Sequence, residues 1–193
     1  MKKLLLLVLV CGLSLTLSAS IHVFAGMNAN MAAFDAGGAV YATESALGFQ
    51  GGVSYIMDMG HFMIEPGVRF NTRGFSYTGG GDYNFNAYYA DIFGRFGYTI
   101  SDNLPLTGYA GLSVGFLLSA KDELLEFLYP SFKTTDDTNA VNVGLLVGAR
   151  YVIGEKFTFG AEYDYGFTDI YEENKGWKGL KFYSANVLLG YLF

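Results

Sequence analysis

Residues that could ligate a transition metal or carry redox chemistry are almost missing from this sequence. It has one cysteine, Cys11, and two histidines, His22 and His61, in 193 residues. Cys11 lies in an N-terminal segment that we expect to be removed, so the mature chain is predicted to have no thiol. Without thiols neither a disulfide nor a thiolate metal site can form. With so few histidines as well, we expect no metal and no cofactor.

Charge and long apolar runs are also scarce. Charged residues make up 16% of the chain, and 18 Asp and Glu outweigh 12 Lys and Arg. This acidic balance argues against nucleic acid as a partner. After the N-terminal segment, no apolar run reaches the roughly 18 residues that a membrane-crossing helix needs, so we expect no such helix.

Proline is rare, whereas glycine and aromatic residues are abundant. The chain has 3 Pro against 26 Gly, 17 Phe and 15 Tyr. This composition is typical of transmembrane β-strands, whose signal is spread weakly over many short segments.

The N-terminal segment differs from the rest. Lys2 and Lys3 precede the apolar run Leu4–Leu17, and the small residues Ser18–Ser20 follow it. This order predicts a secretory signal peptide over residues 1–20. The apolar run is too short for a membrane anchor. Residues 21–193 are then expected to form one β-barrel domain.

The C-terminal stretch Leu180–Phe193 has the clearest pattern. Alternate residues counted back from Phe193 are apolar and mostly large, which indicates a β-strand. Soluble strands run to about five or six residues, whereas a tilted membrane-crossing strand needs roughly 9–11. An unpaired strand edge in lipid leaves backbone polar groups unsatisfied, so such a strand predicts a closed barrel.

Seven earlier segments alternate in the same way, and Pro66 in one of them predicts a bulge or a missing ladder bond. They are His22–Met31, Leu47–Met57, His61–Arg73, Asn86–Ile100, Leu106–Ser119, Ala140–Val152 and Phe157–Thr168. Short turns alternate with long loops, the longest of which contains a helix-like stretch, Asp122–Leu128. The pattern predicts an all-β fold, an eight-stranded antiparallel up-and-down transmembrane β-barrel. Such barrels lie in the bacterial outer membrane, with both mature termini on the periplasmic side.

Two eight-stranded architectures fit this alternation: a soluble ligand-binding barrel with its apolar face inward, and a membrane barrel with that face outward. An eight-stranded barrel has room inside for few side chains, so rows of Phe and Tyr would overfill it. The membrane barrel is therefore favoured, and eight charged residues point inward. They are Glu65, Arg69, Arg73, Asp91, Arg95, Arg150, Glu162 and Asp164. Buried charges must be paired, so we expect a structural ion-pair network that plugs the lumen. The alternatives are an ion or proton path and a catalytic cluster.

Catalytic groups do not gather at the expected outer rim. His22 and His61 are both predicted at periplasmic strand ends, so a Ser-His-acid site is not expected. A carboxylate site at Glu162 and Asp164 is the remaining enzymatic alternative. We predict that the protein is not an enzyme.

Four segments resemble the PorT-like outer-membrane β-barrel family common in Bacteroidetes. They are Ala25–Asn28, Glu65–Phe70, Tyr109–Lys121 and Tyr163–Ile170. The resemblance implies an outer-membrane barrel; one class of members serves protein secretion and gliding. The chain end also resembles the signal read by the barrel-assembly machinery, with Asn186, Tyr191 and Phe193 at its polar and aromatic positions. That machinery is thus an expected partner during insertion.

The residues before the last strand combine positive charge with the only tryptophan. Lys175, Trp177, Lys178 and Lys181 are predicted near the outer interface. We expect them to contact lipopolysaccharide phosphates, with ordinary interfacial anchoring as the alternative. The long loops predict a structural or surface-interaction role, since loops carry function on rigid scaffolds. A narrow channel, a secretion or transport accessory and, less favoured, a lipid-modifying enzyme remain as alternatives.

Overall fold

The computed structural model describes residues 18–36, 39–77, 83–101, 104–128, 134–171 and 179–193. Strands dominate this part of the chain. They are β1 (Ser18–Ala36), β2 (Ala39–Ala42), β3 (Glu44–Met59), β4 (Phe62–Ser76), β5 (Asn84–Ser101), β6 (Leu104–Asp122), β7 (Val141–Ile153), β8 (Phe157–Gly166) and β9 (Lys181–Leu192). Two short helices, α2 (Glu123–Leu128) and α3 (Thr134–Asp137), lie between β6 and β7.

The sheet closes on itself. Each long strand pairs antiparallel with its neighbour along the chain, and β9 pairs with both β8 and β1. The closing register runs from His22 opposite Leu192 to Ala33 opposite Lys181. The predicted eight-stranded barrel is therefore confirmed. Closure leaves none of the eight long strands with an unpaired edge along the barrel wall, as a sheet surrounded by lipid requires.

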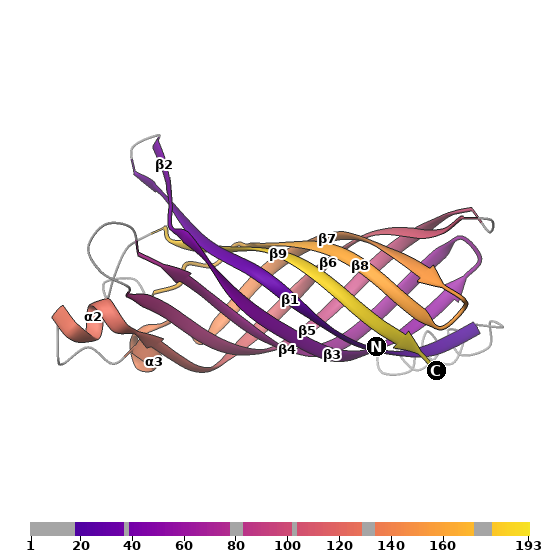
Figure 1. Cartoon of the computed structure of the whole chain (residues 1–193), viewed down its shortest axis with the longest axis horizontal. Coiled ribbons are helices and arrows are strands. Elements are labelled where there is room, and N and C mark those ends of the chain that lie inside the picture. The colour runs from indigo at the N-terminus through magenta and orange to yellow at the C-terminus, as the bar shows by residue number, and fades with distance from the viewer. Residues whose placement is uncertain (1–17, 37–38, 78–82, 102–103, 129–133, 172–178) are drawn as a thin grey trace, which may run out of the picture.

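The two ends of the barrel differ (Figure 1). At one end, here the loop end, lie β2, α2, α3, the end of β4 and the start of β5. At the other, here the turn end, lie the short turns and the C-terminus. One of these turns uses positive backbone φ angles at Gly154 and Glu155, 58° and 68°, which suits a tight hairpin.

Most predicted strand boundaries differ from the observed ones by a few residues, but the prediction of one loop was wrong. Residues 32–46 were expected to be a loop; instead β1 continues to Ala36 and pairs with β2 as a hairpin beyond the barrel rim. Residues Ser18–Ser20, assigned to the signal peptide from sequence, are paired with β3 in strand β1. Of the two features expected at Pro66, a bulge or a missing ladder bond, the structure shows the second. The register between β3 and β4 does not shift there, but ladder pairs are missing.

The apolar and the charged side chains of each strand point in the predicted directions, outward and inward. On β5, Ile92 and Phe96 are 57% and 55% exposed, whereas Asp91 and Arg95 are 1% and 2% exposed. The bulky apolar set thus covers the outside of the barrel, and the charged set lies in the lumen. None of the helices described is long and apolar enough to cross a membrane.

Candidate functional site: the lumen, its loop-end cap and a gap in the wall

The middle of the lumen holds one ion-pair network, which joins all eight charged residues predicted to point inward. Arg69 on β4 lies at its centre. Its guanidinium is 2.8 Å from Asp91, 2.7 Å from Glu162 and 2.7 Å from Asp164. These carboxylates come from β5 and β8, so Arg69 ties opposite parts of the wall together across the lumen.

The other three arginines extend the network toward both ends. Arg73 lies 3.1 Å from Asp91 and 3.4 Å from Asp164 on the loop-end side. Toward the turn end, Arg95 lies 2.6 Å from Glu162 and 3.3 Å from Glu65. Arg150 then lies 2.9 Å from Glu65. Each charged side chain has a partner of opposite sign, as burial demands.

Aromatic rings cover the flat faces of these arginines. The Arg95 guanidinium lies 4.4 Å from the ring centre of Phe93 and 5.0 Å from that of Tyr109. Arg73 lies 4.8 Å from the ring of Tyr89. Guanidinium groups bind carboxylates at their edges and rings at their faces. Large rings therefore fill space between the ion pairs, which the predicted ion-pair network did not include.

His22 lies inside the barrel near the turn end and joins the network. Its Nε2 is 2.9 Å from the Thr158 hydroxyl, and its Nδ1 is 3.2 Å from Glu65. A hydroxyl, an imidazole and a carboxylate in this order resemble a proton relay. However, Thr158 is 4% exposed, and a Cβ on Gly190 would stand 2.6 Å from its hydroxyl. This close packing holds the hydroxyl, the imidazole and the carboxylate in fixed positions within the network.

The turn end of the lumen is open as a cavity of about 470 Å³, with Arg150, Asp58 and Thr107 among its lining residues. The loop end, in contrast, is closed by a packed apolar cap. Phe75 and Phe85 stack there with ring centres 5.0 Å apart, and Phe182 packs against both. The lumen thus has two barriers in series, an ionic layer and an aromatic cap.

A single carboxylate ties the loops above this cap. The fully buried Asp122, where β6 ends, accepts hydrogen bonds at one oxygen from the hydroxyls of Tyr77 and Tyr171. Its other oxygen accepts from the backbone N–H groups of Leu124 and Leu125 at the start of α2. Three loop-end connections therefore meet at one side chain.

The two tyrosines are held in the protonated form. Burial, followed by the neighbouring Asp122, raises the pKa of Tyr77 above its ordinary value of 10. The pKa of Tyr171 is raised by burial and by the nearby Tyr77 and Asp122. Both hydroxyls consequently remain donors at any physiological pH. The loop that carries Tyr171 is further fixed by the Asn139 amide, which donates to the carbonyls of Asp169 and Tyr171 over 2.8 Å and 3.0 Å.

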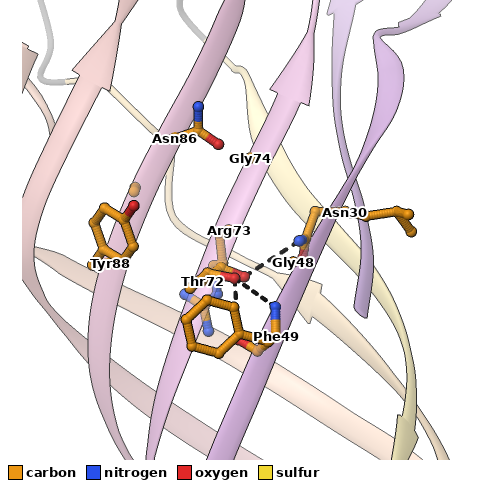
Figure 2. Close-up of a pocket in the computed structure, with 10 residues that line it drawn as sticks. Asn30, Gly48, Phe49, Thr72, Arg73, Gly74, Asn86 and Tyr88 are labelled. Atoms are coloured by element: carbon orange, nitrogen blue, oxygen red, sulfur yellow. Dashed lines mark hydrogen bonds between the residues drawn. The ribbon is translucent and has the colours of Figure 1, made fainter. Parts of the chain in front are cut away.

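The wall has a gap between β3 and β4 near the loop end (Figure 2). A crevice of about 150 Å³ lies there, lined by Asn30, Leu47, Gly48, Phe49, Thr72, Arg73, Gly74, Asn86, Ala87 and Tyr88. The alternation over His61–Arg73 puts Thr72 on the same outward face as Phe70; in the structure its side chain instead lies within the wall and bonds to the backbone of Phe49. The alternation in the sequence gave no sign of this gap.

The remaining predicted residues lie apart from the lumen network. Lys175, Trp177 and Lys178 fall outside the described residues, and Lys181 begins β9 opposite Ala33. Residues of the expected assembly signal lie on and just after β9. Asn186 is buried in the lumen, whereas Tyr191 and Phe193 form a ring pair 4.7 Å apart at the turn end. Within the described ranges, no cluster of three or more His, Cys, Asp or Glu side chains has a geometry for holding a metal ion.

Residues 14–172 match the family described as outer membrane protein beta-barrel domain. This chain belongs to that family. The match covers most of the strands that form the wall, and it places this outer-membrane barrel in the bacterial outer membrane. No curated protein matches the sequence.

Solved structures support the same fold for this outer-membrane barrel. Neisserial surface protein A is 17% identical, with a TM-score of 0.54 and coverage of 91% of this chain and 99% of that chain. Ail, the attachment invasion locus protein of Yersinia pestis, solved in complex with the heparin analogue sucrose octasulfate, is 14% identical. Its TM-score is 0.50, and coverage is 91% of this chain and 99% of that chain.

We predict that Arg69→Met destabilises this outer-membrane barrel by about 3–5 kcal/mol, because three buried carboxylates lose their shared cation. Urea unfolding in lipid vesicles measures the change. Lys121→Met is the matched control, since Lys121 forms an exposed pair with Glu123 at 3.3 Å and should change the free energy of unfolding by less than about 1 kcal/mol. Equal effects of the two variants would contradict a structural role for the network.

Proposed function

We propose that this small outer-membrane barrel is a closed, non-enzymatic platform that presents its loop end to the outside of the cell. The observation that carries the proposal is the contrast between the two ends. The loop end is sealed by an aromatic cap, and its connections are tied to the buried Asp122. Preorganised loops lose little entropy on binding, which favours a recognition role.

Orientation follows from the connections. Outer-membrane barrels have short periplasmic turns and long extracellular loops. By this rule the loop end is extracellular, and both mature termini are periplasmic. Residues 1–20 would then act as a removed signal peptide, and residues 21–193 would be the barrel domain. Asn186, Tyr191 and Phe193 would serve recognition by the barrel-assembly machinery.

The exposed tip of the platform is apolar and acidic. Phe127 and Leu128 on α2 are 69% and 54% exposed, and Tyr83 stacks on Phe127 with ring centres 5.9 Å apart. Asp136 on α3 is exposed and adds negative charge, whereas Glu123 is paired with Lys121. Ail is described in complex with a heparin analogue, a polyanion, but these described loop-end residues do not favour such a ligand here. We infer instead an apolar or cationic partner surface, together with lipopolysaccharide contacts through Lys175, Trp177, Lys178 and Lys181.

Two finer proposals concern the family and transport. The motifs quoted above support membership of a PorT-like branch, for which a secretion accessory role is the second candidate function. A narrow channel is less favoured, because the ionic layer and the aromatic cap both block the lumen. Enzyme activity is not proposed, because the hydroxyl-bearing Thr158 and His22 of the relay are both buried.

The closed lumen is tested in planar lipid bilayers. We expect no steady ion current from the purified protein. We expect none from Phe75→Ala/Phe85→Ala either, because the network around Arg69 still blocks the middle. A steady current through the unmodified protein would contradict the platform and favour the channel.

The orientation is tested by labelling intact cells with a membrane-impermeant maleimide. In a Cys11→Ser background, Phe127→Cys at the loop end should be labelled on intact cells. Lys156→Cys, exposed at the turn end, should be labelled only after the outer membrane is opened. The reverse pattern would contradict the proposed orientation.

A further inference from the structure

The ladder between β3 and β4 is interrupted at one place. The strands pair up to Gln50 opposite Asn71 and again from Ser45 opposite Phe75, with a register shift between. Four residues of β3, 46–49, therefore lie opposite three residues of β4, 72–74. The Thr72 hydroxyl spans part of the gap: it accepts from the backbone N–H of Phe49 over 2.7 Å and donates to its carbonyl over 3.1 Å.

The lumen supports this interruption with polar side chains. The amides of Asn28 and Asn30 on β1 donate to the Thr72 carbonyl over 2.9 Å and 3.2 Å. Gly48 lets them approach, because a Cβ there would stand 2.3 Å from Asn28 and 2.4 Å from the Thr72 hydroxyl. An unsatisfied backbone group costs several kcal/mol in hydrocarbon. A gap that recruits three polar side chains from two strands is therefore a built feature of the wall.

The groups around the opening are neutral hydrogen-bonding groups. Asn86 on β5 is exposed beside the crevice, and its side-chain amide can both donate and accept hydrogen bonds. Arg73 lines the crevice, but its charge is balanced inside the lumen by Asp91 and Asp164. The crevice is thus suited to sugar hydroxyls and to the ester or amide links of acyl chains, and less suited to phosphate.

An aromatic row lies next to the crevice on the lipid-facing side. Phe49, Phe70 and Tyr88 lie on β3, β4 and β5, with ring centres 5.8 Å and 6.0 Å apart, and they are 57%, 37% and 42% exposed. Because this row belongs to the apolar outer surface of the barrel, acyl chains already cover it. The polar crevice matches the head group of a lipid molecule, and the apolar row matches its acyl chains.

We propose that the gap between β3 and β4 seats one glycolipid of the outer leaflet. Its sugar and acyl-linkage groups enter the crevice beside Asn86 and Thr72, and its acyl chains lie on the row of Phe49, Phe70 and Tyr88. The assignment to the outer leaflet rests on the proposed orientation of the barrel.

Native mass spectrometry of the detergent-purified full chain tests the seat. Purified lipid A and phosphatidylethanolamine are supplied in separate arms, and the fraction of protein that retains one lipid is measured. We expect retention of one lipid A molecule. Asn86→Leu/Tyr88→Leu should lower the retained fraction about tenfold, because the hydrogen bond from Asn86 and the ring contact of Tyr88 with the acyl chains are both lost.

Tyr98→Leu is the matched control: Tyr98 lies on the same strand, is 46% exposed and belongs to the other end of the barrel. Its retention should equal that of the unmodified protein, and heat-modifiable migration in gels confirms that all variants are folded. The proposed lipid site would be overturned if the unmodified protein retained no lipid A, or if Tyr98→Leu lowered the retained fraction as much as Asn86→Leu/Tyr88→Leu. Equal retention of phosphatidylethanolamine would overturn the glycolipid. The maleimide pattern reports orientation separately, so failure of the seat and failure of the orientation are distinguishable.

Discussion

A membrane offers no hydrogen-bond partners to a peptide backbone, and this constraint governs the whole molecule. It requires the sheet to close, which it does where β9 pairs with β1. Where the ladder fails beside Thr72, the same constraint explains why hydroxyl and amide side chains fill the gap. The long strands, the closed register and the supported gap are three consequences of one physical requirement.

A barrel of only eight strands has a narrow interior, and this interior must be filled by side chains. The solution combines two properties of arginine. Its edges bind carboxylates, as Arg69 binds Asp91 and Asp164, and its faces bind rings, as Arg95 binds Phe93. The result is a dense, charge-balanced core in which hydrophobic and ionic contacts are interleaved. A closed interior in turn leaves the loop end as the surface where function is expected.

Much of this architecture could be predicted from the sequence, because a period of two fixes which residues share a face. This period correctly predicted that Asp91 and Arg95 lie in the lumen. It also predicted the number of strands, eight. Pairing partners could not be predicted, since Arg69 and Glu162 lie far apart in the sequence and meet only across the barrel. Strand β2 and the gap at Thr72 were missed for a related reason. The one-residue register shift left no mark in the alternation of residue types along the sequence, and the segment that forms the β1–β2 hairpin reads as a loop because it does not alternate clearly.

The direction in which the two faces point can be measured directly. In a Trp177→Phe background, Ile92→Trp and Phe93→Trp place the only tryptophan at adjacent positions of β5, where the original side chains are 57% and 3% exposed. Each folded variant is inserted into vesicles of lipids brominated along their acyl chains, and tryptophan fluorescence is recorded. The account predicts strong quenching for Ile92→Trp and weak quenching for Phe93→Trp. Strong quenching at position 93 with weak quenching at position 92 would contradict it.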